Sequence, residues 1–144
     1  MIAVVCSAVI QGEEGFLLVK EFKPECKDKW GLPGGKLEEN ESLSSCVRRE
    51  VLEETGFTVI SDNLLCVVNK PVTSEKNSVV KFIFKCEIAG NPTSKAAHEY
   101  NFISIDKIKS LDSEDKLRGA EILEILESIH NNTFDKALIL RTIN

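Results

Sequence analysis

Apolar residues occur along the chain in short runs, separated by polar stretches that contain glycine, proline or asparagine. Two runs, residues 2–10 and 16–20, flank the sequence QGEEG, and this arrangement predicts a β-hairpin. The stretch 21–33 is polar and contains two prolines, so we expect a loop. Three further strands are predicted, with a turn near the sequence TSEKN between the first two: residues 58–70, 78–89 and 100–105.

Two other segments carry apolar residues at helical spacing. Residues 41–55 are predicted to form a helix, with Asn40 as the N-cap and Gly56 directly after the last turn. Residues 120–130, with the sequence AEILEILESIH, are predicted to form a second helix that packs on the sheet. The tail 131–144 contains an apolar run that is compatible with a strand, a helix or an oligomer contact.

Strands at both ends of the chain, with helices between and after them, predict an α/β (α+β) fold in which helices flank a mixed β-sheet. The chain has 144 residues, which is enough for one domain with a single core. No linker-like composition interrupts it, so we interpret residues 1–144 as a single domain.

The composition narrows the classes of function. The formal net charge is −5 at neutral pH. This argues against a broad nucleic-acid-binding face, which needs clustered Lys and Arg, but it allows a single nucleotide held through metal ions. No apolar run approaches the ~20 residues of a membrane span, and the N-terminus lacks the basic region of a signal peptide. Five cysteines without a CxxC pair argue against a disulfide framework, so we expect reduced thiols and a cytoplasmic location.

The predicted helix at 41–55 combines an apolar stripe with three glutamates. At about 100° per residue, the stripe consists of three residues: Leu43, Val47 and Val51. On the same construction Glu50, Glu53 and Glu54 border or overlap that stripe. Carboxylates at the edge of a core repel one another and lose solvation, and a divalent cation relieves both costs. We therefore prefer a Mg²⁺ or Mn²⁺ site to a solvated helix face.

Two further features support a ligand site next to this helix. Arg49 lies four residues before Glu53, so it can hold that carboxylate in place through an ion pair. Gly34 and Gly35 allow the backbone to turn tightly and to approach a phosphate or a metal with its N–H and C=O groups. The spacing of a Walker A loop is absent.

These features share one stretch, GLPGGKLEENESLSSCVRREVLEETGF, which resembles the Nudix box, G-x5-E-x7-R-E-U-x-E-E-x-G-U with U a bulky aliphatic residue. Every fixed position is filled: Gly35, Glu41, Arg49, Glu50, Val51, Glu53, Glu54 and Gly56. Phe57 takes the last apolar position, where the box has an aliphatic residue. Glu41 matches the first glutamate of the box, which in the family supports the loop and pairs with the arginine.

The resemblance implies a hydrolase that cleaves the diphosphate linkage of a nucleoside diphosphate derivative, on an α/β/α sandwich with a mixed β-sheet. It implies Mg²⁺ or Mn²⁺ held mainly by Glu50 and Glu54, with Glu53 close by. The carbonyl of Gly34 or Gly35 is expected to complete the site. Such ions would activate a water, and a carboxylate would take its proton.

The general base in this family is a helix glutamate or a glutamate from a later loop. Glu53 is the helix candidate, with Arg49 orienting it. Glu99, in the sequence AAHEYNF, is the loop candidate for a base or a further metal ligand. His98 beside it is given no role. Trp30 could stack on a nucleobase, the alternative being a half-buried core residue.

The preferred hypothesis is therefore a metal-dependent pyrophosphohydrolase, with a (d)NTP, ADP-ribose or a dinucleotide polyphosphate as the substrate. The chain lacks the long N-terminal extension that many ADP-ribose enzymes use to dimerise, which favours a compact enzyme of the triphosphate type; a homodimer is left open. A Nudix-fold nucleotide sensor without turnover is the second hypothesis, and the complete glutamate set disfavours it. A carboxylate-rich metal buffer is the third, and it would need no Gly-Gly loop.

Overall fold

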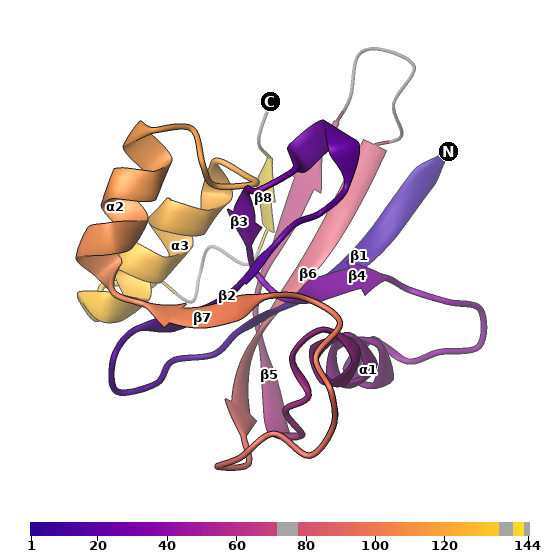
Figure 1. Ribbon diagram of the computed structural model, residues 1–144. Helices are drawn as coiled ribbons and strands as arrows, with labels where there is room; N and C mark the ends of the chain where they lie inside the picture. Colours follow the sequence, from indigo (N-terminus) through magenta and orange to yellow (C-terminus); the bar gives the residue numbers. More distant parts are fainter. Residues whose placement is uncertain (72–77, 136–139, 143–144) are drawn as a thin grey trace.

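The computed structural model describes residues 1–71, 78–135 and 140–142, in which two β-sheets lie between helices (Figure 1). The larger sheet is mixed and has the strand order β4-β1-β6-β5-β8, in the chain Gly34–Lys36, Ile2–Val9, Ser78–Ile88, Val59–Lys70 and Leu140–Thr142. The smaller sheet is antiparallel and has the order β3-β2-β7, in the chain Trp30–Gly31, Phe16–Lys20 and Tyr100–Ile103. The predicted mixed sheet is confirmed, and three strands form a second sheet beside it.

The strand β1 determines which distant residues meet. It pairs in parallel with β6, so that Val5 lies opposite Lys81, and antiparallel with β4, so that Ser7 lies opposite Gly34. The glycine pair and Lys81 therefore lie on the two sides of one strand, although they are far apart in the sequence.

The prediction that residues 2–10 and 16–20 pair as a hairpin is wrong. The two strands meet only at their turn, where the Leu17 N–H donates to the Ile10 carbonyl at 2.9 Å, and then enter different sheets. The last part of β1 and most of β2 are buried, because core residues cover both faces of these strands. Apolar runs separated by a glycine turn look the same in sequence whether or not the strands pair.

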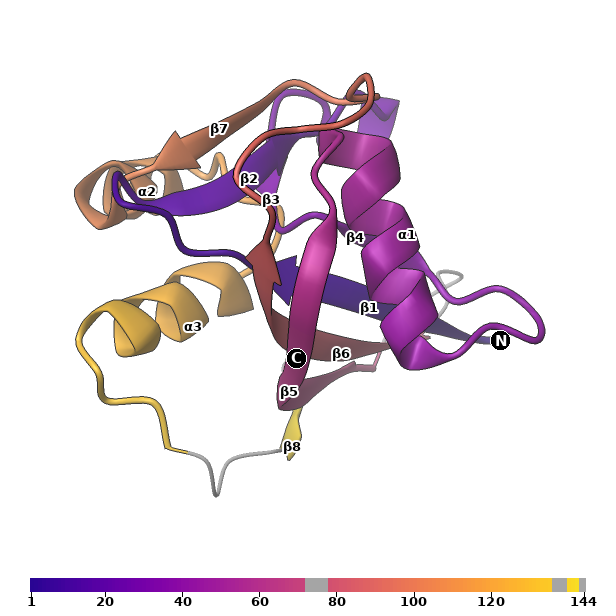
Figure 2. The same ribbon diagram turned by 90° about the horizontal axis from the view of Figure 1, so that it is seen from below.

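Helices cover both sides of the sheets (Figure 2). One side carries α1 (Leu43–Thr55), and the other carries α2 (Ile105–Ser113) and α3 (Glu121–His130). Each side has its own apolar core, one packed against α1 and the other against α2 and α3. This arrangement confirms the predicted α/β/α sandwich.

Helix α1 begins two residues later than predicted, and the predicted N-cap is wrong. The Ser42 hydroxyl accepts a hydrogen bond from the Ser45 N–H at 3.0 Å, so Ser42 is the cap. Asn40 lies in the preceding turn with a φ of 62°, a left-handed conformation that asparagine tolerates. Gly56 ends the helix as predicted, with a φ of 80° and its N–H bonded to the Leu52 carbonyl.

Helix α2 is absent from the sequence-based prediction, which assigned its first residue to a strand. Ser104 caps this helix by accepting a hydrogen bond from the Lys107 N–H at 3.3 Å. The buried residues Ile105, Ile108 and Leu111 are three positions apart, which is a helical spacing in a segment too short to stand out.

Some of the remaining predictions concern described residues, and others concern residues outside them. The helix predicted at 120–130 is confirmed as α3, and part of the tail forms β8, parallel to β5. The TSEKN turn and residues 136–139 lie outside the described residues. All five cysteines are free, and four of them are buried. Among the described residues, no helix is long and apolar enough to cross a membrane.

Candidate active site

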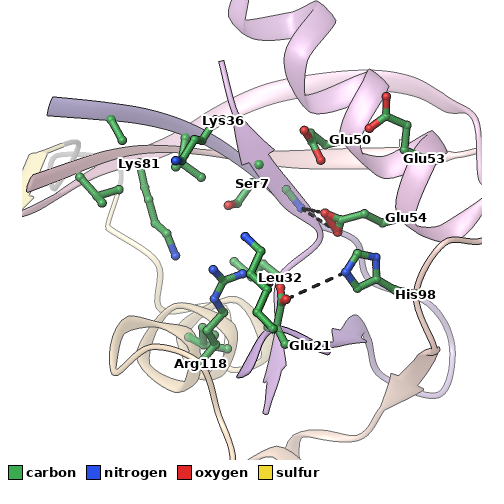
Figure 3. A pocket seen from close by; sticks show the side chains of 18 of the residues that line it. Ser7, Glu21, Leu32, Lys36, Glu50, Glu53, Glu54, Lys81, His98 and Arg118 are labelled. Atoms are coloured by element: carbon green, nitrogen blue, oxygen red, sulfur yellow. Dashed lines mark hydrogen bonds and ion pairs between the residues drawn. The ribbon is translucent and has the colours of Figure 1, made fainter. Parts of the chain in front are cut away.

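A pocket of about 580 Å³ lies between α1, β1, β4, the residues that follow β2 and the start of α3. Charged residues of both signs line it, including Lys23, Lys36 and Arg118. Four glutamates, here called the carboxylate side, line one part: Glu21, Glu50, Glu53 and Glu54. Two lysines, here called the lysine pair, line another: Lys70 and Lys81. Figure 3 shows Glu50 and Glu54 of α1 on one side, with Lys81 and Arg118 across from them. The volume is in the range of small-molecule sites.

Helix α1 supplies three of these glutamates from beside its buried stripe. Val47 and Val51 are fully buried, as the predicted helical arc requires. Glu54 is 6% exposed and the Glu50 side chain 15%, so both lie at the edge of the core. The Glu53 side chain is 56% exposed and therefore lies further out on the helix.

Arg49 donates hydrogen bonds to three carboxylates at once. Its Nε and Nη2 donate to the two oxygens of Glu41 at 2.6 and 3.0 Å. Its Nη1 donates to Glu50 at 2.7 Å and to Glu53 at 3.3 Å. The hydrogen bond from Arg49 lowers the pKa of Glu41 to about 2, and the bond to Glu41 raises the pKa of Arg49. The contact between Arg49 and Glu53 that the spacing predicts is present, as is the pair with Glu41.

The glycines Gly34 and Gly35 are close to the helix glutamates. A Cβ on Gly34 would lie 2.3 Å from the Cys6 carbonyl oxygen, and one on Gly35 would lie 2.4 Å from the Glu50 carboxyl carbon. The Gly34 N–H donates to both oxygens of Glu54, at 3.3 and 3.4 Å. Any side chain at Gly35 would therefore displace the Glu50 carboxylate.

The carboxylate side is chemically suited to a divalent cation. Burial and the charge of Glu50 raise the pKa of Glu54 to about 8, against the opposing effect of the Gly34 N–H. A cation would stabilise the ionised form of this crowded carboxyl, and carboxylate and carbonyl oxygens are what Mg²⁺ and Mn²⁺ prefer. In the described part of the chain, no three His, Cys, Asp or Glu side chains converge on one point. Glu50 is bonded to Arg49 and Glu54 to Gly34, so these carboxylates would have to turn toward an ion.

The loop between β6 and β7 is docked on the end of α1. The Ala97 N–H donates to the Glu53 carbonyl at 3.0 Å. The next amide, of His98, donates to the Glu54 carbonyl at 3.1 Å. These bonds hold the His98 ring in the pocket lining, where it stacks on Phe22 with 4.6 Å between the ring centroids.

Glu21 is a buried member of the carboxylate side that follows β2. Arg118 donates a short hydrogen bond to its Oε1, and its Oε2 lies 4.0 Å from His98 Nε2 (Figure 3). Among the described residues, neither Glu21 Oε2 nor His98 Nδ1 has a hydrogen-bond partner, although both atoms are buried. Buried polar atoms without partners in a pocket lining are candidates for contact with a ligand.

The structure does not bring Glu99 or Trp30 into the lining of this pocket. The Glu99 side chain is 65% exposed and forms an ion pair with Lys20 at 3.4 Å. Trp30 lines a second hollow of about 370 Å³ and packs on the core beside α2 and α3. The aromatic side chains that line the pocket are His98 and Phe22, of which Phe22 is 62% exposed.

The lysine pair shares one buried carboxylate. Lys70 Nζ and Lys81 Nζ lie 2.7 and 3.1 Å from the same oxygen, Glu121 Oε1. Burial alone would raise the pKa of Glu121, but the charges of the two lysines outweigh it and lower the pKa to about 2. Burial lowers the pKa of Lys81, against the charge of Glu121.

A model of the NUDIX domain matches residues 1–126 of the chain. The chain belongs to the Nudix family. It is 33% identical over 96 residues to an 8-oxo-dGDP phosphatase of Homo sapiens, covering 65% of this chain and 28% of the relative. It is 28% identical over 111 residues to an ADP-ribose pyrophosphatase of Methanocaldococcus jannaschii, covering 76% of this chain and 66% of the relative. A solved NUDIX hydrolase from Nitrosomonas europaea superposes with a TM-score of 0.79 at 25% identity, over 93% of this chain and 92% of that one.

The aligned segment makes up only 27% to 34% of the length of three curated Nudix relatives. The similarity therefore concerns the Nudix domain, and these relatives contain further sequence that this chain does not match.

Sequence reasoning identified the Nudix box but missed several polar residues of the pocket, among them Glu21, Lys70, Lys81, His98 and Arg118. Two signals were available. Lys81 interrupts the apolar run SVVKFIF, and Glu21 directly follows the apolar run FLLVK. Charged residues inside or next to buried strands are rarely there without a partner or a ligand.

Proposed function

We propose that this chain is a metal-dependent Nudix hydrolase that cleaves the diphosphate linkage of a nucleoside diphosphate derivative. The observation that carries the proposal is the complete set Glu50, Glu53 and Glu54 on one side of a nucleotide-sized pocket, next to the glycine pair. Three crowded carboxylates beside a binding pocket are costly unless a cation and an anionic ligand accompany them.

Mg²⁺ or Mn²⁺ would be held by Glu50, Glu53 and Glu54, with the carbonyl of Gly35. When bound, such an ion neutralises the diphosphate and acidifies a water. Arg49 acts as a positioning residue, because its hydrogen bonds to Glu50 and Glu53 hold these side chains next to the proposed metal site.

Glu53 is the favoured general base. It lines the pocket and, at 56% exposed, is the helix glutamate most accessible to water. Its carboxylate would accept the proton of the attacking water. Glu99 is the second candidate, disfavoured because its side chain is directed to Lys20 and solvent.

The substrate is a small molecule with a nucleoside at one end. The relatives are named for 8-oxo-dGDP and for ADP-ribose, so an oxidised nucleotide and ADP-ribose are the first compounds to test. We assign the stacking role that the sequence suggested for Trp30 to Phe22, whose ring is at the pocket and is backed by His98 on one side.

The test is a substrate screen with purified protein in Mg²⁺ and in Mn²⁺. It includes 8-oxo-dGDP, 8-oxo-dGTP, dGTP, ADP-ribose and a dinucleotide polyphosphate, with products identified by mass. Running the reaction in ¹⁸O-labelled water shows which phosphorus is attacked. We expect hydrolysis of at least one compound, and its loss on chelation with EDTA. Tight binding of a nucleotide without turnover of any compound would support the sensor function and refute the hydrolase.

A further inference from the structure

The lysine pair is unusual because two cations share one anion in a buried setting. The side chains of Lys70 and Lys81 are 26% and 19% exposed, and that of Glu121 is fully buried. Both lysines contact the same carboxylate oxygen, and the described residues contain no other acidic partner for either one. One carboxylate cancels one ammonium group, so with both lysines protonated the cluster carries one surplus positive charge.

A purely structural role does not account for this arrangement. One lysine would be enough to neutralise Glu121 and to fasten the start of α3 to the sheet. A second lysine adds a desolvation cost and no further compensating charge. Because both lysines line the pocket, the surplus charge is available to whatever binds there.

The apolar surroundings strengthen the interactions that this charge can make. Val5 lies opposite Lys81 and Val79 opposite Lys70 in the sheet, and both line the pocket, as does Ile122 next to Glu121. A low local dielectric makes a charged hydrogen bond stronger. Each ammonium group has three N–H donors and uses one of them on Glu121. This part of the pocket therefore offers donors and positive charge, across from the carboxylate side (Figure 3).

We propose that the lysine pair binds an anionic substituent, phosphate or carboxylate, that the substrate carries in addition to its diphosphate. This inference rests on the proposed function, since it assumes that the diphosphate lies at the carboxylate side. The anionic substituent can belong to the group X or to the ribose of the nucleoside, and the experiment separates these two sources.

The experiment compares two pairs of compounds that differ by one anionic group. UDP-glucose and UDP-glucuronate differ in X, whereas ADP-ribose and its 2′-phosphate differ in the nucleoside. Dissociation constants are measured by calorimetry with Ca²⁺ in place of Mg²⁺, and rates are measured separately with Mg²⁺. We expect the anionic member of one pair to bind about tenfold more tightly. The pair that responds identifies which end of the substrate lies at the lysines.

Lys81→Met should reduce the preference for the anionic compound to within about twofold, because one of the two ammonium groups is lost and with it the surplus charge. The fold should tolerate the change, since Lys70 still neutralises Glu121. Lys85→Met is the matched control, because Lys85 is exposed on the same strand and outside the pocket. It should leave the preference unchanged.

Glu121→Gln should act in the opposite direction and raise the preference about threefold, because it removes the counter-charge. A merely structural cluster would lose stability in both variants, with no opposite shifts in selectivity. Lys70→Met replaces this test if Glu121→Gln does not fold, and it should lower the preference as Lys81→Met does.

Equal affinities within both pairs, or no binding of any of the four compounds, would overturn the inference. Hydrolysis of other nucleotides in the substrate screen would still leave the proposed function in place. Absence of hydrolysis with a preserved charge preference would refute the hydrolase and retain the anion site. The two failures are therefore distinguishable.

Discussion

The carboxylate side and the lysine pair occupy one pocket but arise in different ways. Three of the four glutamates come from a single helix, and a glycine pair just before that helix completes their surroundings. The lysines come from β5 and β6, and their shared carboxylate comes from α3. In the proposed roles, a local motif would supply the reaction chemistry, whereas the lysine pair, which would distinguish substrates, is assembled by tertiary structure. We expect changes on the carboxylate side to alter turnover and changes at the lysine pair to alter affinity.

The largest effect is expected from Glu53→Gln, which removes the favoured base. The value of kcat should fall by about 10²- to 10⁴-fold, with the melting temperature nearly unchanged because Glu53 is half exposed. Steady-state kinetics on the substrate found in the screen measures this. Glu87→Gln, at an exposed glutamate on β6, is the control and should keep full activity. A comparable loss of kcat in Lys81→Met would contradict the expectation that the lysine pair alters affinity and not turnover.

The pH dependence of stability is the second test of the carboxylate side. The pKa of Glu54 is about 8 in the folded protein and near its ordinary value of 4.5 in the unfolded chain. Stability from this group is complete below about pH 4.5 and is lost as the pH rises through 8. Urea unfolding in EDTA should show a loss on the order of a few kcal/mol between pH 5 and pH 9.

Glu54→Gln should remove this dependence, and Mg²⁺ should restore stability to the wild type at pH 9. A wild-type profile that rises over the same interval would contradict the role of burial at Glu54. Glu87→Gln should retain the wild-type profile, since this glutamate is exposed.

Gly35→Ala tests whether the glycine pair belongs to the carboxylate side. The new methyl group would take the space of the Glu50 carboxylate, which must move away. We expect kcat/KM to fall about 10- to 100-fold, together with a higher Mg²⁺ requirement. The control is Gly90→Ala, because a Cβ at Gly90 meets no atom within 4 Å. Equal activity of the two variants would show that the position of Glu50 is unimportant.

Phe22→Ala tests whether the phenylalanine ring in the pocket lining stacks on the nucleobase. Loss of a stacking surface should raise KM by several-fold, up to about tenfold, with kcat unchanged. Phe22→Tyr should behave like the wild type. Trp30→Phe should also leave KM unchanged, because Trp30 lines the other hollow. A larger effect at Trp30 than at Phe22 would return the stacking role to the tryptophan.

The smallest effect is expected from Glu99→Gln. Its side chain is exposed and outside the pocket lining, so kcat should stay within about twofold of the wild type. A loss as large as that of Glu53→Gln would instead identify Glu99 as the base.

Periodicity predicted the parts of the molecule that depend on local sequence. The arc formed by Val47 and Val51 placed Glu50 and Glu54 at the core edge correctly, because helix geometry alone determines that relation. The cap at Ser42 was missed because several nearby polar residues offered equally good caps. The helix α2 was missed because its helical spacing extends over only nine residues.

Contacts between distant segments could not be predicted in the same way. Lys81 reaches the pocket because β6 pairs with β1 in parallel, and the alternation of residues in a strand does not specify its neighbour. The sequence assigned no role to His98, yet its side chain is only 13% exposed and lines the pocket because its loop docks on α1. Such docking depends on backbone hydrogen bonds, which carry no side-chain signature.

The docking of this loop on α1 limits how Nudix sequences can be recombined. The amides of Ala97 and His98 bond to consecutive carbonyls of α1, so helix and loop are held in register. Adding or deleting a single residue just before Ala97 would move the His98 ring away from its stack on Phe22. A chimaera that exchanges the box should therefore exchange residues 92–98 with it, as one transferable cassette.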